Sequence, residues 1–529
     1  MPSLKLGRND DAHSQERVDN EGDDTHHPEP TERSRLLPRD PPAYLSPDDP
    51  AVSPYNLWSI RALRGLSSLF LALSFIWWTF LLVSLFVSPP MMHSRGSGFF
   101  SFAYTTLTTG YLVISLLFFA VPSKPMTIWG IIIGVFLCID MILTLAVPRI
   151  RVEEGWVGVA SVVWATFIAL YSIFQNRAVE WGKREEEERL TGRPESRRPL
   201  REWIAVLLQT IFMAIFGIVS ILFTATLILR ARDASLAAPG KRYLVNSNNY
   251  EVHLHCVGSP NATTQYLNDV PTVLIEGGEG PVEHTLQPFI DNAYQSGLVP
   301  RYCYWDRPGF AWSDNAPSPF SAGMAADALS EALALAGEEG PWVLVSAGAG
   351  GIYSRIFASR HLIEVTGILL IDTAHEDYLP KLGSPGRGFG LWLQGVLSPL
   401  GLDRIAGALF KGRTREDRVY GRSAYQTGKY IKAKLQENLV AKSMTASEVQ
   451  TARHIQMSET PLVVVSSGVE VRRSHKWAQT QEDLTKITKN LKNWDIVSGA
   501  PHEVWKTVEG RRLLEKRLGE LLETESREF

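Results

Sequence analysis

The sequence predicts a helical membrane region followed by a domain built on a mostly parallel β-sheet. Residues 65–147 contain only three fully charged side chains among the 529 residues of the chain, namely Arg95, Lys124 and Asp140. Apolar segments in this region have the length of about 20 residues that crosses a bilayer core of about 30 Å. From Lys241 onward, short apolar runs alternate with stretches of helical character, a pattern typical of parallel sheets with crossover helices.

The first 60 residues are expected to form a disordered tail. They hold 6 Lys and Arg against 12 Asp and Glu, many prolines and few aliphatic residues. Such a segment buries too little apolar surface to offset the entropy of ordering. No signal peptide is indicated, because the first apolar run begins only near Gly65. The first apolar segment is therefore expected to target and anchor the chain.

Five segments are long and apolar enough to span a membrane. Prolines at positions 122, 125 and 148 lie between these segments, where helices are expected to stop. Five such helices within 165 residues would outgrow a soluble core, so membrane spans are favoured over buried core helices. The predicted spans are residues 65–87, 99–121, 126–147, 156–174 and 203–229.

Basic residues predict the orientation of the spans, because positive side chains resist translocation. With the tail in the cytosol, the inner loops carry Lys124 and eight Lys and Arg in residues 177–202, whereas the outer side carries five basic residues. An odd number of spans then places the C-terminal domain in the lumen or outside the cell. The sequon Asn261-Ala262-Thr263 predicts lumenal glycosylation, and residues 32–37 resemble an acidic dileucine signal readable from the cytosol. We expect an endomembrane, such as the vacuolar one, or the plasma membrane.

Asp140 lies inside the third predicted span, where a carboxylate is costly and is commonly functional. The alternative is a position near one interface, within reach of water or of Arg149. A transport function of the five spans would rest on Asp140 alone.

Net charge and cysteine content exclude several classes of function. The 53 Lys and Arg against 56 Asp and Glu give a net charge of −3, so no basic field for nucleic acid is expected. Cys138, Cys256 and Cys303 are too few and too scattered for a disulfide scaffold or a zinc site, and they indicate little about compartment. We expect the lipid bilayer as a partner, no nucleic acid, no metal and no cofactor.

The C-terminal half is predicted to begin with a β-hairpin that pairs residues 242–245 with residues 250–257. Helices are expected at residues 325–336 and 510–522, where apolar residues recur at helical spacing. Residues 378–458 interrupt the alternation and predict a helical insertion. The further predicted strands are residues 273–276, 301–305, 342–345, 367–371, 462–466 and 494–497.

Residues 304–314 read Tyr-Trp-Asp-Arg-Pro-Gly-Phe-Ala-Trp-Ser-Asp. This segment resembles the Y-D-R-P-G-x-G-x-S-D loop that follows the fourth strand of α/β-hydrolases. The resemblance covers residues 240–522, about half of the chain, and implies an eight-stranded sheet with a lid after the sixth strand, where residues 378–458 lie. The chain as a whole resembles uncharacterised multi-pass fungal membrane proteins that carry such a domain at their C-terminus.

The resemblance implies a nucleophilic serine at the apex of the turn after the fifth strand, and this chain has Gly348 there. The family motif is G-x-S-x-G, whereas residues 346–350 read Ser-Ala-Gly-Ala-Gly. The apex residue is held in a strained backbone conformation that only glycine adopts without cost. Glycine in place of the serine therefore relieves about 1–3 kcal/mol of backbone strain. Ser346 lies two residues before the apex, where its side chain is expected to point away from the pocket.

The other parts of the family's site have candidates in the sequence. His502 follows the last strand, at the family's position for the base, and either Asp372 or Glu470 takes the position of the acid. The turn Glu276-Gly277-Gly278 resembles the family's His-Gly-Gly turn, and its N–H groups, with that of Ala349, imply an oxyanion pocket. The alternative for the histidine and the carboxylates is that they are hydrogen-bonded loop residues without a catalytic role.

The sequence therefore favours a membrane-anchored α/β-hydrolase-fold protein that is non-catalytic and binds a small molecule or another protein. The first alternative is a membrane-tethered serine-type hydrolase of lipids or esters, which uses His502, one of the two acids and a nucleophile that the sequence does not identify. The second alternative is a transporter.

Overall fold

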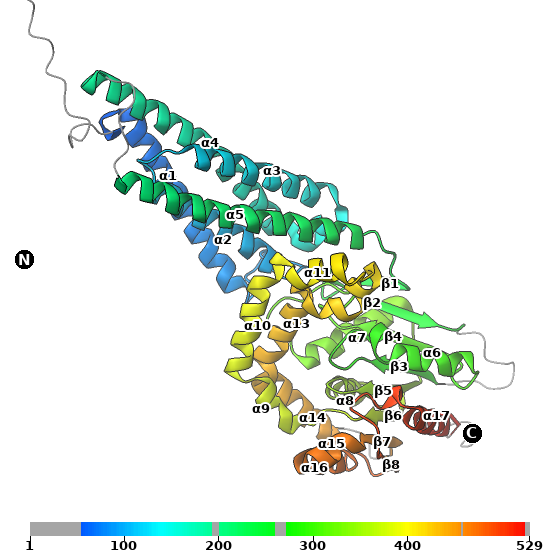
Figure 1. The fold of residues 1–529 in the computed structure, drawn as a ribbon. Coiled ribbons are helices and arrows are strands. Elements are labelled where there is room, and N and C mark those ends of the chain that lie inside the picture. Colours follow the sequence, from blue (N-terminus) through cyan, green and yellow to red (C-terminus); the bar gives the residue numbers. More distant parts are fainter. Residues whose placement is uncertain (1–53, 193–199, 260–270, 456–458, 524–529) are drawn as a thin grey trace, which may run out of the picture.

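The computed structural model describes residues 54–192, 200–259, 271–455 and 459–523. In these residues, a long helical bundle joins an α/β domain at one end (Figure 1). The predicted tail up to Ser53, the dileucine-like segment at residues 32–37 and the sequon at Asn261 lie outside the described residues.

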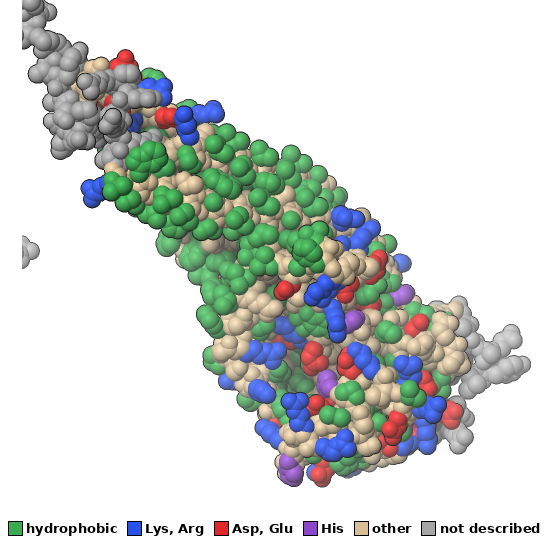
Figure 2. Space-filling view, in the orientation of Figure 1, with side chains coloured by type: hydrophobic (Ala, Val, Ile, Leu, Met, Phe, Trp, Pro, Cys, Tyr) green, Lys and Arg blue, Asp and Glu red, His purple; other side chains and the backbone are tan. Residues whose placement is uncertain are grey.

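Five apolar helices of the described chain form the bundle, and each is long enough to cross a membrane. This confirms the predicted spans. Figure 2 shows a mostly hydrophobic surface over the bundle, as expected of helices that face lipid. The helices are α1 (Trp58–Ser84), α2 (Phe99–Leu117), α3 (Lys124–Ala146), α4 (Pro148–Thr191) and α5 (Leu200–Asp233).

Helix α4 has 44 residues and is much longer than the span predicted at residues 156–174. The prediction followed the apolar residues only, whereas the helix continues through a charged segment in which Lys183 pairs with Glu187 and with Glu202 of α5. Gly155 interrupts the helix with φ +61°, a conformation that glycine adopts without strain. Residues 148–154 therefore form a separate short piece of helix at the end of the bundle.

Asp140 is fully buried in the bundle and accepts a hydrogen bond of 2.8 Å from the Tyr104 hydroxyl of α2. The sequence left open that Asp140 lies near an interface, within reach of water or of Arg149, and the structure gives Arg149 other partners. Arg149 instead lies within ion-pair distance of Glu153, Glu251 and Asp314. These three carboxylates at the end of the bundle give the guanidinium nearer partners than Asp140 does.

The α/β domain contains an eight-stranded sheet with the strand order β1-β2-β4-β3-β5-β6-β7-β8. The predicted hairpin of β1 (Lys241–Val245) and β2 (Tyr250–Val257) is present, and β2 also pairs antiparallel with β4 (Tyr302–Asp306). The remaining pairs are parallel. This mostly parallel sheet confirms the α/β-hydrolase fold class. Its other strands are β3 (Thr272–Glu276), β5 (Trp342–Ala347), β6 (Val365–Ile371), β7 (Leu462–Ser467) and β8 (Leu491–Val497).

Helices cover both faces of the sheet. Since strand side chains alternate between the faces, successive residues of β5 belong to different cores. On one face, Leu344 of β5 belongs to a core with α7 (Ala322–Ala336) and α8 (Gly350–Arg360). On the other face, Val343 and Val345 belong to a core with α6 (Gln287–Gln295) and α17 (Val508–Glu523). Two short helices, α15 (Gly468–Arg473) and α16 (His475–Leu484), lie between β7 and β8.

The chain between β6 and β7 is helical, as predicted, and packs against the bundle as well as the sheet. Helices α10, α11 and α12 contact α2 and α5, while Ile431 and Leu435 of α13 belong to a hydrophobic cluster with Leu81 and Phe99 of the bundle. The insertion therefore connects the two halves of the molecule (Figure 1). Its helices are α9 (Leu379–Leu382), α10 (Pro385–Leu397), α11 (Leu402–Phe410), α12 (Arg415–Val419), α13 (Gly428–Val440) and α14 (Ala446–Ile455).

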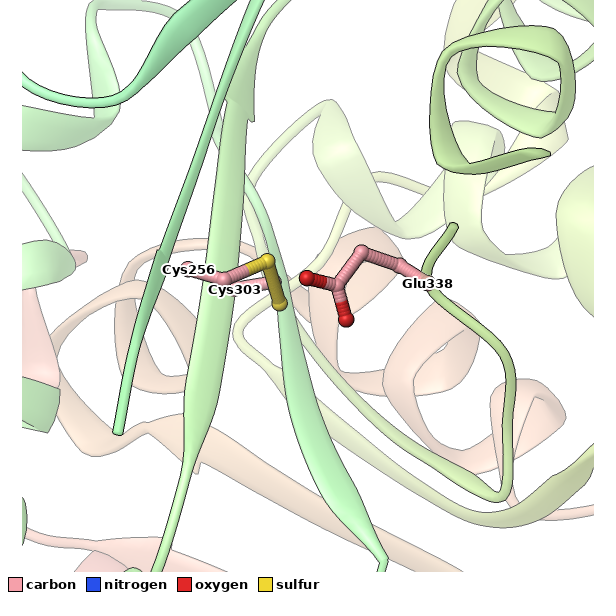
Figure 3. Close-up of side chains that lie close together, drawn as sticks. All are labelled: Cys256, Cys303 and Glu338. Carbon is pink, nitrogen blue, oxygen red and sulfur yellow. A yellow bond between two sulfur atoms is a disulfide. The ribbon is translucent and has the colours of Figure 1, made fainter. Parts of the chain in front are cut away.

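Cys256 and Cys303 form a disulfide between β2 and β4. The interpretation of all three cysteines as scattered and uninformative is wrong for this pair, since residues 47 apart in sequence lie opposite each other on adjacent strands. Figure 3 shows the S–S bond with the Glu338 side chain beside it. Cys138 of α3 is free.

Arg149 connects the bundle to the α/β domain. Its guanidinium lies 2.6 Å from Asp314 Oδ1 and 3.1 Å from Glu251 Oε2, and its Nε lies 2.9 Å from Glu153 Oε1. Asp314 is fully buried and ends the segment that resembles the α/β-hydrolase loop. Asp233, at the end of α5, makes a second connection by pairing with Arg404 and Arg418 of the insertion.

Replacing Arg149 with alanine is expected to destabilise the protein, because the buried Asp314 would lose its nearest cation and keep only Arg95 at 4.0 Å. Breaking one partner of a buried ion pair costs about 3–5 kcal/mol. Thermal unfolding of the detergent-solubilised full chain measures the effect. Arg151→Ala is the matched control, since Arg151 is exposed on the same short piece of helix. Equal unfolding temperatures for the two variants would contradict this role of Arg149.

Candidate functional site

The structure brings the predicted site residues together at the carboxyl edge of the sheet, where parallel α/β sheets place their sites. Gly348 follows β5 at the turn into α8, Asp372 follows β6, and the turn at residues 277–280 follows β3. His502 reaches this edge from the loop after β8.

His502 and Asp372 form a hydrogen-bonded pair, with 2.6 Å between His502 Nδ1 and Asp372 Oδ2. Asp372 is fully buried, and its Oδ1 accepts hydrogen bonds from the Ser467 N–H and the Trp477 indole N–H. Its backbone has φ +46°, a left-handed conformation that aspartate tolerates better than most residues. These contacts hold the carboxylate against the imidazole and fix the orientation of the ring.

Glu470, the other candidate acid, has different partners. It lies in the first turn of α15, where the Ser467 hydroxyl accepts a hydrogen bond from its backbone N–H. Its carboxylate lies 3.8 Å from the Arg473 guanidinium. Of the two carboxylates that the sequence left open, the structure pairs Asp372 with His502.

Gly348 has φ +51°, in the left-handed region expected at the apex of this turn. A Cβ added at this position would lie 2.5 Å from Glu279 Oε2 and 2.8 Å from Glu279 Oε1. The Glu279 carboxylate therefore fills the space that a serine side chain would need. Ser346 is fully buried in β5, and its hydroxyl makes no hydrogen bond to any described residue.

Glu279 is the site residue that the sequence analysis missed. Its Oε1 accepts a hydrogen bond of 3.0 Å from the Ala349 N–H, the donor predicted for the oxyanion pocket. Its Oε2 lies 3.7 Å from His502 Nε2. Of the backbone donors expected at Gly277, Gly278 and Ala349, the Ala349 N–H thus already binds an anion of the chain itself. The sequence does show an acidic residue within the glycine-rich turn. Its contact with the turn after β5, however, depends on the tertiary fold.

Neighbouring charges shift the pKa of His502 and the pKa of Glu279. Desolvation acts to lower the pKa of His502, but the hydrogen bond to Asp372 and the nearby Glu279 carboxylate outweigh it and raise this pKa to about 10. Desolvation acts to raise the pKa of Glu279, but His502, Lys434 and the Ala349 N–H outweigh it and lower this pKa to about 2. At neutral pH the site is therefore an imidazolium ion between two carboxylates.

These shifts have opposite consequences for stability at low and high pH. The raised pKa of His502 contributes stability that is fully present below its unfolded pKa of about 6.5 and is lost as pH rises through about 10. The lowered pKa of Glu279 contributes stability that is present above about pH 4.3 and is lost as pH falls toward about 2. The ion pair is therefore retained in mildly acidic as well as neutral surroundings.

The turn that carries Glu279 is held from both sides. The Arg307 guanidinium donates a hydrogen bond to the Gly278 carbonyl, and the Tyr430 hydroxyl of α13 donates one of 2.7 Å to the Glu279 carbonyl. Glu276, at the histidine position of the family's turn, accepts a hydrogen bond of 2.6 Å from the Trp305 indole. Burial raises the pKa of Glu276 to about 7. The position of the Glu279 side chain is thus supported by its own backbone contacts.

Two cavities lie near these elements. The space beside Arg307 and Tyr353, below α13, has a volume of about 10 Å³, enough for about one water molecule. A cavity of about 150 Å³ lies at the junction with the bundle and is lined by neither His502 nor Glu279.

Two groups of side chains in the described chain have donor atoms close enough to share a cation. In the first, with Glu338, the Cys256 and Cys303 sulfurs are joined in the disulfide and offer no thiolate ligand. In the second, burial raises the pKa of Asp306 to about 7, and its carboxyl lies 2.9 Å from His253 Nδ1 with Glu283 nearby. A proton shared within this buried group accounts for the close contact, and the absence of a metal stays a prediction.

Comparison with known proteins establishes the family. Residues 31–256 match a family described as "Region of unknown function (DUF2417)". Over 526 residues, the chain is 35% identical to an uncharacterized protein of Schizosaccharomyces pombe (C23C11.06c), which covers 93% of this chain and 96% of that protein. The chain belongs to the same family as this Schizosaccharomyces pombe protein. It is also 22% identical to an uncharacterized vacuolar membrane protein of Saccharomyces cerevisiae (YNL115C), over 79% of this chain and 82% of that one.

Solved structures similar to the C-terminal half include two described as α/β-hydrolases. MGS-M2, an alpha/beta hydrolase enzyme from a Medee basin deep-sea metagenome library, has a TM-score of 0.39 and 11% identity over 53% of this chain and 96% of that one. A putative alpha/beta hydrolase from Nostoc sp PCC 7120 has a TM-score of 0.39 and 12% identity over 54% and 98%. Because these similarities are remote, the fold assignment of this DUF2417 protein rests on its own strand order and insertion.

Proposed function

We propose that this protein is a membrane-anchored, non-catalytic α/β-hydrolase-fold protein whose C-terminal domain binds a small molecule or another protein. The observation that carries the proposal is the position of the Glu279 carboxylate. It lies where the family places its nucleophilic oxygen, and it accepts the hydrogen bond of the Ala349 N–H.

Ester hydrolysis by this fold needs a nucleophile, a base and a vacant oxyanion pocket. Gly348 has no side chain to attack a substrate. His502 is protonated at neutral pH, since two carboxylates raise its pKa to about 10, so it cannot accept a proton as a general base. The Ala349 N–H donates a hydrogen bond to the Glu279 carboxylate and is therefore not free to stabilise a developing oxyanion.

A second function is favoured by the ionised state of Glu279. Its side chain is 55% exposed, so a substrate could reach the carboxylate. A carboxylate can attack an electrophilic carbon, expel the leaving group and form an ester with the substrate. The ester would carry no charge, the pKa of His502 would then fall, and the His502–Asp372 pair could activate a water molecule to hydrolyse the ester. This function would be that of a hydrolase with a carboxylate nucleophile.

We also propose that the tail faces the cytosol and the α/β domain faces the lumen of a vacuole-like compartment. The distribution of basic residues supports this orientation. The Cys256–Cys303 disulfide also supports it, because disulfides persist in oxidising compartments and are rare in the cytosol. The Saccharomyces cerevisiae relative is named a vacuolar membrane protein.

Replacing Glu279 and Gly348 together tests the non-catalytic proposal. The wild type and Gly348→Ser are expected to be inactive, the latter because its Cβ would meet the Glu279 carboxylate. Glu279→Ala/Gly348→Ser is expected to hydrolyse p-nitrophenyl acetate, since it frees the Ala349 N–H, lowers the pKa of His502 and supplies a hydroxyl. Release of p-nitrophenolate by the purified full chain measures the rate, which should exceed the control by about 100-fold.

Glu279→Ala/Gly348→Ala is the matched control, because it opens the same space without adding a hydroxyl. Equal rates for the two double variants would show that His502 and Asp372 are not aligned with the apex of the turn. Turnover by the wild type that Glu279→Gln abolishes would instead contradict the non-catalytic proposal and establish the carboxylate mechanism.

The orientation can be tested by counting free thiols in the full chain from acid-quenched cells. Under denaturing conditions, a maleimide is expected to label one cysteine, Cys138, before reduction and three after it. A Cys138→Ser variant should show none before reduction. Labelling of all three cysteines without reductant would place the α/β domain in a reducing compartment and contradict the proposed orientation.

A further inference from the structure

The cavity of about 150 Å³ lies where the bundle meets the α/β domain. Its walls come from the adjoining ends of α2, α4 and α5, from β1, from the loop after β4, and from the insertion between β6 and β7. Figure 2 shows charged side chains gathering at this junction, where the hydrophobic surface of the bundle ends. Since neither His502 nor Glu279 lines the cavity, its role does not depend on catalysis at the hydrolase-like site.

The lining of the cavity is strongly basic. Six basic side chains face it, compared with two acidic ones, Glu153 and Asp233. Three further carboxylates, those of Glu154, Glu251 and Asp314, pair with the same cations from outside the lining. The six positive charges of the lining thus exceed the five negative charges by one. They are Arg149, Arg230, Arg242, Arg404, Arg418 and Lys429.

Two of the six have no carboxylate partner among the described residues, Arg242 and Lys429. The Arg242 guanidinium lies over the Trp312 ring, and its Nε is buried without a hydrogen-bond partner in the described chain. The Lys429 ammonium donates a hydrogen bond of 2.9 Å to the Ala311 carbonyl. Burial lowers the pKa of Lys429 to about 8, as expected of a cation without an adequate counter-charge.

Arg404 supplies a third donor without a partner in the described chain. Arg404 pairs with Asp233 through one terminal nitrogen, while its Nε is buried and has no hydrogen-bond partner in the described chain. Unpaired buried donors are costly, so a cavity that collects them favours a ligand rich in acceptor oxygens. Guanidinium groups match the geometry of phosphate oxygens, which accept several such hydrogen bonds at once.

Part of the lining is apolar and belongs to the membrane-spanning helices. Phe100 of α2 and Phe223 and Leu227 of α5 contribute to it. A ligand that fills the whole cavity must therefore combine an anionic group with an apolar part. Membrane lipids with anionic headgroups have this composition, since they join a phosphate group to apolar acyl chains.

We propose that this cavity binds the phosphate headgroup of an anionic membrane lipid. Arg242, Lys429 and Arg404 bind the phosphate oxygens, and the first part of the acyl chains lies against Phe100, Phe223 and Leu227. The bundle supplies the apolar contacts, and the α/β domain with its insertion supplies the unpaired cations. Lipid binding would thus stabilise the junction between the two halves of the protein.

Dioctanoyl phosphatidic acid is the probe for this site, added to the full chain in a neutral detergent. It should raise the unfolding temperature in a concentration-dependent way, from which a dissociation constant follows. Arg242→Gln and Lys429→Gln are each expected to weaken binding by about tenfold, the effect of losing one charge-assisted hydrogen bond. Lys241→Gln is the matched control, because Lys241 is exposed next to Arg242 and does not line the cavity.

Two further probes distinguish the source of the phosphate. Inorganic phosphate tests the headgroup chemistry alone, and uncharged dioctanoyl glycerol tests the apolar part alone. Both are expected to bind much more weakly than phosphatidic acid.

Equal stabilisation by inorganic phosphate would assign the cavity to a soluble anion, and equal stabilisation by dioctanoyl glycerol would remove the role of the cations. Either result would overturn the proposal, as would wild-type affinity in Arg242→Gln and Lys429→Gln. If these variants unfold at a lower temperature without ligand, native mass spectrometry of the folded fraction measures lipid binding directly. Undiminished lipid retention by that fraction would also overturn the proposal.

Discussion

The carboxylate of Glu279 determines what the hydrolase-like site can do. It lies between the Ala349 N–H and the His502 imidazolium, in the volume that a side chain at Gly348 would require. A side chain at the apex would have to displace this carboxylate from its present position. Gly348 and the position of Glu279 therefore form one structural feature, in which the carboxylate takes the space beside the glycine and accepts the hydrogen bond of the Ala349 N–H. Asp372 pairs with the ring through Nδ1, so two carboxylates face a single imidazolium.

The same elements that hold this site also connect the α/β domain to the membrane helices. At one end of the loop after β4, Arg307 binds the Gly278 carbonyl, and at the other end Asp314 pairs with Arg149 of α4. On α13, Lys429 lines the junction cavity, and its neighbour Tyr430 binds the Glu279 carbonyl. The hydrolase-like site and the junction are thus parts of one packed structure, linked through a loop and a helix.

The positions of Gly348 and His502 followed from the resemblance to α/β-hydrolases, which left Asp372 and Glu470 open as the acid. Local sequence patterns were sufficient to predict the spans and the strands. These features depend on hydrophobic period and on the order of elements along the chain, which a single sequence shows directly. Contacts across the fold were not predictable in this way. Glu279 accepts a hydrogen bond from a turn 70 residues away. The Cys256–Cys303 bond depends on the pairing of β2 with β4. Arg149 has partners in the α/β domain. Each of these depends on tertiary placement rather than on periodicity.

The protonation state of His502 tests the account most directly. In the full chain with ¹³C-labelled histidine, its ring resonance can be assigned by its loss in His502→Gln and followed with pH. The account predicts that His502 stays protonated well above neutral pH, with a pKa near 10, and that Glu279→Gln lowers this pKa by at least about one unit, since it removes one of the two carboxylates beside the ring. A His502 that titrates near its ordinary pKa of about 6.5 in the wild type, or whose pKa does not respond to Glu279→Gln, would contradict the account.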